Sequence, residues 1–205
     1  MRTIIIIIFS FTIISCESEQ SRKDRIKKIE QQRIEHVRIQ KERELKAEKQ
    51  AKELRIAKEL HDKYAENQLS TGDTPYSNIY GSNKKCNGYN CSQIKVKTPQ
   101  NSDVLVTIKQ NEIVVRHAYI RARSSYTFEV PNGLYQPFFY YGKGWNPYKL
   151  MKETTQGEIL GGFVDSEHFG KDFPQKLNDN ILTYELILQT NGNFSTQPSN
   201  ASEAL

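Results

Sequence analysis

The sequence predicts an α+β protein, in which a long charged α-helix precedes an antiparallel β-sandwich of about seven or eight strands. Residues 22–69 contain no glycine or proline and are rich in Glu, Lys, Arg, Gln, Ala and Leu, which are strong helix formers. Beyond Pro75 the pattern changes to alternating apolar and polar residues, in short runs separated by turn signals. Two facing sheets can bury such runs, which favours a sandwich over a closed barrel.

The first residues have the layout of a secretory signal. Arg2 precedes an apolar run, Ile4 to Ile14, that is too short to span a bilayer, which takes about 20 apolar residues. Ile13-Ile14-Ser15-Cys16 ends this run and resembles the lipobox of bacterial lipoproteins. The resemblance implies that residues 1–15 are removed and that Cys16 carries acyl chains such as palmitate. The alternative is an ordinary secretory signal with a chance cysteine.

Residues 16–21 are then expected to form a lipidated tether, and residues 22–69 a helical arm. Acidic residues recur four positions before basic ones, a spacing worth about 0.2–0.5 kcal/mol per pair in an isolated helix. Apolar heptads are not sustained, because Arg33 and His36 occupy the positions that would continue a seam. We expect a solvated spacer helix, with a weak coiled coil or partial disorder as alternatives.

Gly72 and Pro75 end the helical pattern and mark the start of the head, residues 70–196. Asn132-Gly133 predicts a tight hairpin between two strands. Residues 197–205 are expected to be a polar tail. The main strands are expected over residues 94–96, 104–108, 113–122, 126–130, 134–141 and 183–189.

The cysteine count predicts one disulfide. If Cys16 carries lipid, Cys86 and Cys91 remain, and a single pair in an exported chain is expected to be oxidised. Closing so short a loop stabilises the fold by about 2 kcal/mol. A metal site is the rival interpretation, but two cysteines without a nearby His or Cys supply too few ligands.

Several strings of the head carry a family resemblance. They are Pro131-Asn132-Gly133-Leu134-Tyr135, Tyr140-Tyr141-Gly142-Lys143-Gly144-Trp145-Asn146-Pro147, Gly162-Phe163, His168-Phe169, Tyr184-Glu185-Leu186-Ile187-Leu188 and Asn191-Gly192-Asn193. Over residues 71–205 they resemble an uncharacterised family of bacterial envelope lipoproteins. This resemblance implies a fold and an envelope location, and it implies no catalytic residue. The Pro-Asn-Gly-x-Tyr hairpin is also similar to hairpins of transthyretin-like and PEGA-like sandwiches.

The aromatic run from Phe138 to Tyr148 is the candidate ligand-binding region. A strand sends alternate side chains to opposite faces, so the four aromatics at 138–141 place two rings on each face. Either the irregular segment 146–179 folds back and buries the second pair, or the rings are exposed and bind a sugar or peptide by stacking and hydrogen bonding. The candidate contact residues are Tyr140, Tyr141, Trp145, Asn146 and Tyr148.

No catalytic residue, metal or cofactor is expected. His117 has no nucleophile motif near it, and Asp165-Ser166-Glu167-His168 matches no metal-binding loop. The net charge of +5 is not concentrated, because residues 17–69 hold fifteen Lys/Arg against twelve Asp/Glu and residues 70–205 hold thirteen against twelve. A nucleic-acid partner is therefore not expected.

These observations predict a membrane-anchored lipoprotein of the bacterial cell envelope, in the outer membrane rather than the inner. The head is expected to be a non-catalytic recognition or adaptor module for a glycan or protein ligand, and the arm would hold it off the membrane. The alternative is a structural or assembly component that self-associates through its helix and binds no small ligand.

Overall fold

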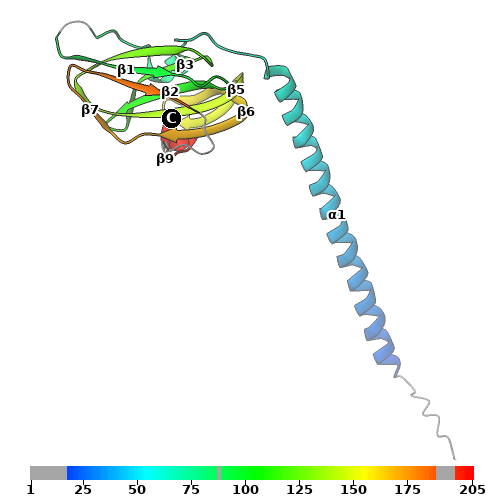
Figure 1. The fold of residues 1–205 in the computed structure, drawn as a ribbon. Helices are drawn as coiled ribbons and strands as arrows, with labels where there is room; N and C mark the ends of the chain where they lie inside the picture. The colour runs from blue at the N-terminus through cyan, green and yellow to red at the C-terminus, as the bar shows by residue number, and fades with distance from the viewer. Residues whose placement is uncertain (1–17, 87–88, 188–196) are drawn as a thin grey trace, which may run out of the picture. The chain divides into compact units, whose positions relative to one another are not determined.

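The computed structural model describes residues 18–86, 89–187 and 197–205 (Figure 1). The expected signal peptide, the lipidation site Cys16 and the Asn191-Gly192-Asn193 turn lie outside these residues, as does the end of the strand expected over 183–189.

The chain divides into two compact units, Met1–Arg55 and Ile56–Leu205. The boundary falls inside the long helix. The predicted α+β class is confirmed, with one long N-terminal helix and mostly antiparallel sheets.

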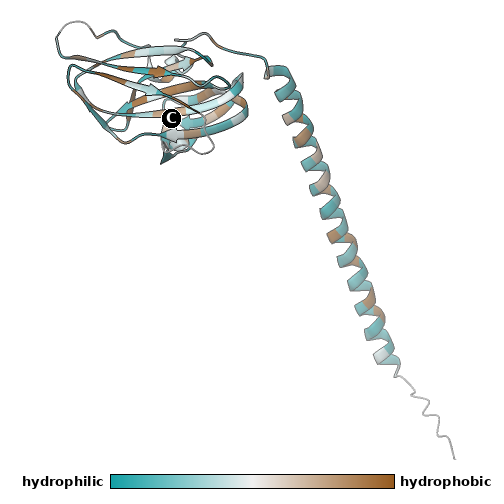
Figure 2. Cartoon of the chain, viewed as in Figure 1, coloured by the Kyte–Doolittle hydropathy of each residue, from teal (hydrophilic) through white to brown (hydrophobic). Residues whose placement is uncertain are grey.

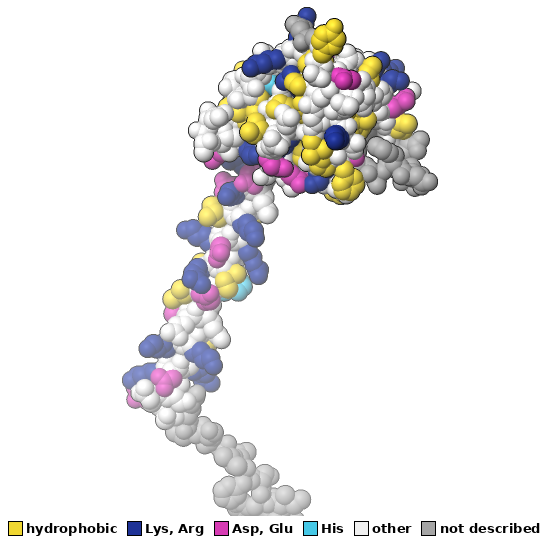
Figure 3. Space-filling view, turned by 90° about the vertical axis from the view of Figure 1, so that its left-hand side faces the viewer, with side chains coloured by type: hydrophobic (Ala, Val, Ile, Leu, Met, Phe, Trp, Pro, Cys, Tyr) yellow, Lys and Arg dark blue, Asp and Glu magenta, His cyan; other side chains and the backbone are white. Residues whose placement is uncertain are grey.

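Helix α1 runs from Glu19 to Tyr64, and Tyr64 is its one buried residue. Apolar residues are scattered along it without forming a stripe (Figure 2), and acidic and basic side chains are mixed over its surface (Figure 3). Local ion pairs support it, such as Lys23 with Glu19 at 3.0 Å. The helix ends at Tyr64, before the expected residue 69. The Asn67 N–H donates to the Tyr64 carbonyl in a tighter turn, and the Asn67 carbonyl and side chain bond to the backbone of Trp145.

Nine described strands form two sheets. In the three-stranded sheet, β1 (Cys91–Lys97) lies between β4 (Ser125–Pro131) and β8 (Ile181–Glu185). β1 pairs antiparallel with β4 and parallel with β8. This parallel pairing was not expected from the sequence, since the residues that separate β1 from β8 hold most of the second sheet.

The larger sheet has the order β3-β2-β5-β6-β9, and its pairings are antiparallel. Its strands are β2 (Asp103–Gln110), β3 (Ile113–Ile120), β5 (Gly133–Thr154), β6 (Gly157–Lys171) and β9 (Gln197–Pro198), and the short β7 (Gln175–Leu177) pairs with the start of β5.

The β5–β6 hairpin is longer than the sequence predicts. The segment 146–179 was expected to be largely irregular because of its glycines and prolines, whereas β5 continues to Thr154 and β6 returns from Gly157. Register shifts after Tyr141, Asn146 and Leu150 absorb the irregular positions, as β-bulges do. Trp145 and Asn146 consequently belong to a strand.

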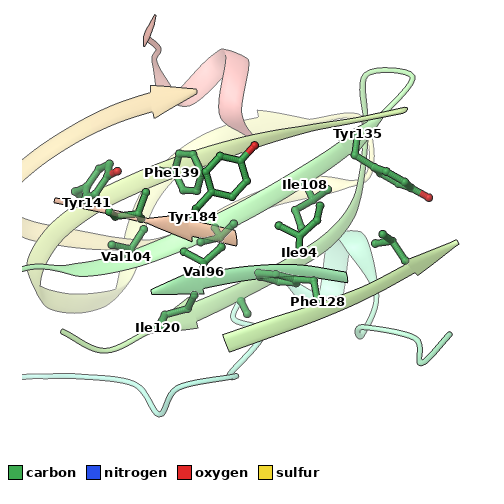
Figure 4. Close-up of a cluster of buried hydrophobic side chains, with 14 of the residues drawn as sticks. Ile94, Val96, Val104, Ile108, Ile120, Phe128, Tyr135, Phe139, Tyr141 and Tyr184 are labelled. Carbon is green, nitrogen blue, oxygen red and sulfur yellow. The ribbon is translucent and has the colours of Figure 1, made fainter. Parts of the chain in front are cut away.

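A first buried cluster takes side chains from both sheets (Figure 4). Its members are mainly the alternating apolar residues of the strands. From the three-stranded sheet come Ile94, Val96, Phe128, Val130 and Tyr184, and from the larger sheet come Val104, Val106, Ile108, Ala118, Ile120, Tyr135, Phe139, Tyr141 and, through β7, Leu177. Leu186, just after β8, completes the cluster.

A second buried cluster uses the other residues of the same strands. Phe138 and Tyr140 alternate with Phe139 and Tyr141, so each pair enters a different cluster and all four rings are buried. Segments outside the strands add to the second cluster. Its members are Tyr76, Leu105, Tyr119, Phe138, Tyr140, Trp145, Ile159, Phe163, Ala204 and Leu205.

Residues 197–205 are not a free polar tail. β9 pairs with the end of β6, and the single-turn helix α3 (Ala201–Ala204) carries Ala204 and Leu205 into the second cluster. The Thr107 hydroxyl donates to the Ala204 carbonyl at 2.8 Å, which satisfies a helix-end carbonyl. The polar composition of the segment concealed these two apolar anchors.

Candidate functional site

The candidate aromatic residues do not form an exposed binding surface. The exposed fractions are 2% for Tyr140, 4% for Tyr141 and 1% for Trp145, and Asn146 is also buried. Tyr148 alone among the five candidates is open to solvent, with 73% of its surface exposed. Of the two interpretations that the sequence left open, the structure favours burial of the rings.

Trp145 is enclosed by edge-to-face ring contacts. Its ring centroid lies 5.5 Å from that of Tyr119 and 5.3 Å from that of Phe163, with interplanar angles of 83° and 84°. This geometry is the favourable one for aromatic pairs. Tyr76, with its ring centroid 6.3 Å away, and Gly161, where a Cβ would lie 2.7 Å from the ring, also border Trp145. Residues 65–75, which we call the strap, run beside the ring, and four of them line a surface cavity together with Trp145.

The strap is held by backbone hydrogen bonds at both ends. The Trp145 N–H donates to the Asn67 carbonyl at 2.8 Å, and the Asn67 side-chain amide donates to the Trp145 carbonyl at 2.6 Å. Further along, the Gly72 N–H donates to the Tyr119 carbonyl and the Tyr119 N–H donates to the Asp73 carbonyl, both at 2.8 Å. The strap thus pairs with the outer edge of β3.

Tyr140 is fixed by polar contacts inside the second cluster. Its hydroxyl accepts the Phe163 N–H at 2.8 Å and donates to the Glu167 carboxylate, which also pairs with Lys149. Burial, then the bond to Glu167, raises the pKa of Tyr140 well above its ordinary value. A hydroxyl held in this way positions β5 against β6, and because Tyr140 is buried the hydroxyl is not open to a ligand.

The strap separates two surface cavities. The first, which we call the polar cavity, has a volume of about 330 Å³ and the second, the apolar cavity, about 390 Å³. Three residues of the strap line the polar cavity, Ala65, Glu66 and Gln68, and four line the apolar one, Leu69, Asp73, Thr74 and Pro75. The polar cavity is lined by Ala65, Glu66, Gln68, Gln100, Asn101, Ser102, Asp103, Ala122, Lys143 and Gly144. The apolar cavity is lined by Leu69, Asp73, Thr74, Pro75, Trp145, Pro147 and Leu160.

Asp103 forms the floor of the polar cavity. It is 2% exposed, and its carboxylate accepts three hydrogen bonds: from the Ala122 N–H at 2.7 Å, the Tyr119 hydroxyl at 2.5 Å and the Gln68 amide at 3.2 Å. A buried carboxylate needs such donors to offset its desolvation. Sequence reasoning passed over Asp103, and a charged residue at the start of a buried strand was the one signal that could have revealed it.

His117 is a core residue. Its Nε2 accepts the Tyr76 N–H at 3.2 Å, and its ring stacks on the Tyr76 ring with centroids 5.9 Å apart. Burial lowers the pKa of His117 to about 4, so the ring is neutral near pH 7. His168 stacks on Tyr141 with centroids 4.2 Å apart, and burial lowers its pKa as well.

The predicted disulfide is present, with Cα atoms of Cys86 and Cys91 5.9 Å apart. Within the described parts of the chain, no group of three or more His, Cys, Asp or Glu side chains is arranged to hold a metal ion. Among these same residues, no helix is both long and apolar enough to cross a membrane.

Comparison of the chain with protein-family models, with curated proteins and with solved structures finds no match. The function is therefore argued from the chain itself.

Proposed function

We propose that this chain is a lipid-anchored protein of the bacterial envelope, in the outer membrane, whose head is a non-catalytic recognition or adaptor module. In this proposal the two sheets act as a β-sandwich scaffold, Cys16 carries the lipid and α1 is a spacer. The resemblance of the head to envelope lipoproteins of uncharacterised function supports the same assignment.

The observation that carries the proposal is the exposure of α1. Every residue from Glu19 to Lys63 is solvent-exposed, and the apolar residues among them form no stripe along the helix. A helix that is polar all round suits a solvent-spanning role. At 1.5 Å per residue, its 46 residues correspond to a reach of about 70 Å.

The lipid anchor has a direct test in Cys16→Ala. We expect the precursor of this variant to remain uncleaved or to leave the membrane fraction, because the acyl chains provide the anchor. Cys86→Ala is the matched control, since it removes a cysteine from the head and should leave membrane retention unchanged. Normal processing and retention of the Cys16→Ala variant would refute the anchor.

A structural role through helix association is the second candidate. It is favoured by apolar side chains exposed on α1, among them Ile34, Val37, Leu45 and Leu54 with exposed fractions of 61–73%. Sedimentation of the full chain over a range of concentrations separates the candidates. A monomer supports the spacer, and a dimer that Leu45→Lys dissociates supports assembly through the helix.

A further inference from the structure

We propose that the polar cavity beside the strap binds a neutral, hydroxyl-rich ligand, that is, a saccharide. This inference rests on the recognition role proposed above and names the ligand class and the site. The candidate aromatic residues are not part of this binding site. Because Tyr140 and Trp145 are buried, their rings cannot stack on a ligand.

The rim of the polar cavity carries unused hydrogen-bonding groups. Among the described residues, the side chains of Glu66, Gln100, Asn101 and Lys143 have no hydrogen-bond or ion-pair partner, although all four line the same cavity. They come from three separate segments: the strap, the turn between β1 and β2, and β5. Their donors and acceptors are thus available to a ligand.

The side chains at the floor of the cavity are held by hydrogen bonds, in contrast to the four at the rim. Asp103 is held by three donors, and the Ser102 hydroxyl donates to the Gly142 carbonyl at 3.2 Å and accepts the Gly142 N–H at 3.1 Å. Gly144 allows the start of the strap to come close, since a Cβ at this position would lie 2.9 Å from the Ala65 Cα and 2.6 Å from the carbonyl oxygen of the preceding Tyr64. A preformed floor lowers the ordering cost of binding.

The charges and the volume select the ligand class. Glu66 and Asp103 disfavour an anion, and Lys143 in the same cavity disfavours a cation. The apolar lining is limited to Ala65, Ala122 and Gly144, which offer little to an apolar ligand. Amides and carboxylates that can each bond a hydroxyl suit a sugar, and about 330 Å³ is at the lower end of the range for small-ligand sites.

The test is a titration of the full chain with three neutral trisaccharides: maltotriose, cellotriose and the β1,4-linked N-acetylglucosamine trimer. Side-chain NH₂ resonances of Gln100 and Asn101 report binding to the unchanged chain, and the side-chain NH₂ of Gln68, which lines the same cavity, reports binding in all variants. We expect at least one sugar to give saturable shifts with a Kd on the order of 1 mM. The double variant Gln100→Ala/Asn101→Ala should weaken that binding about tenfold or more.

Gln156→Ala is the matched control, because Gln156 is an exposed amide in the β5–β6 turn and lines neither cavity. The inference is overturned if none of the three sugars shifts these resonances at about 20 mM, if the double variant binds as well as the unchanged chain, or if inorganic phosphate competes for the same groups. Membrane retention of the native chain is scored separately, so failure of sugar binding and failure of the lipid anchor are distinguishable.

Discussion

The two buried clusters of the head are enclosed by different kinds of structure. The first takes side chains from both sheets, and all its members except Leu186 come from strands (Figure 4). The second lies on the opposite face of the larger sheet, where no further sheet of the described residues covers it. The strap, helix α2 (Ser77–Tyr80) and residues 199–205 close it instead. Strand alternation therefore explains half of the core, and the other half depends on segments with no regular pattern.

The clusters also differ in chemistry. The first is mainly aliphatic, whereas the second is mainly aromatic, and hydroxyls at the second bond to its covering segments. The Tyr76 hydroxyl donates to the Gly161 carbonyl at 2.7 Å, and the Tyr80 hydroxyl donates to the Leu205 carbonyl at 2.7 Å. Such bonds specify where the covering segments lie, because a buried carbonyl left without a donor is costly.

The largest effect is expected from Trp145→Ala. Loss of this ring from the second cluster should lower the free energy of unfolding by about 3–5 kcal/mol. Phe128→Ala makes a comparable truncation in the first cluster, with a loss in the same range of about 3–5 kcal/mol. Urea unfolding gives both values.

Hydrogen exchange then separates the two variants. Trp145→Ala should speed exchange of the Gly72 amide beyond the global loss of stability, because that amide belongs to the strap covering the ring. Phe128→Ala should not do so, since its neighbours lie between the sheets. Equal protection of Gly72 in both variants would show that the strap does not depend on the second cluster.

The sequence predicted the parts of the fold that local rules decide. Helix α1 follows from composition and charge spacing, and the pairs Phe138/Tyr140 and Phe139/Tyr141 follow from strand alternation. The disulfide follows from the cysteine count. What the sequence did not reveal depends on long-range bonds, such as Asn67 to Trp145 across the strap and Thr107 to Ala204 at the end of the chain.

The candidate site shows the same limit. An aromatic run flanked by glycines and Asn is typical both of a sugar-binding surface and of a core closed by another segment. Burial is the outcome, because β6, which belongs to the segment 146–179, places Ile159 and Phe163 in the same cluster as Trp145, and the strap bonds to the Trp145 backbone. No local pattern in residues 65–75 predicts the contact of the strap with Trp145. The polar cavity was missed for a related reason, because its residues are ordinary polar side chains that only the fold brings together.

The next largest effect is a dependence of the free energy of unfolding on pH, caused by His117 beside the second cluster. His117 has a pKa of about 4 when folded because it is buried, against about 6.5 when unfolded. The unfolded state therefore binds more protons between these values, so stability is complete above pH 6.5 and falls as the pH drops toward 4. The shift corresponds to a loss of about 3 kcal/mol.

Urea unfolding at pH 7 and near pH 4 measures this loss. His117→Gln should be less stable at pH 7 but should lack this component of the acid loss. His168 is present in both proteins, and burial lowers its pKa too, so the difference between them isolates His117. An identical pH profile in the variant would place the acid sensitivity elsewhere, for example at the interface of His168 with Tyr141.

The smallest of the three effects is expected from Cys86→Ser. The disulfide closes a short loop between α2 and β1, so its loss should lower the free energy of unfolding by about 2 kcal/mol. The cover of the second cluster should persist, because the strap is held by its own bonds to Tyr119 and Trp145 rather than by this link. Gly72 exchange should accordingly quicken only in proportion to the global loss of stability. Complete unfolding of the head in this variant would mean that the segments covering the second cluster depend on the disulfide as well as on their hydrogen bonds.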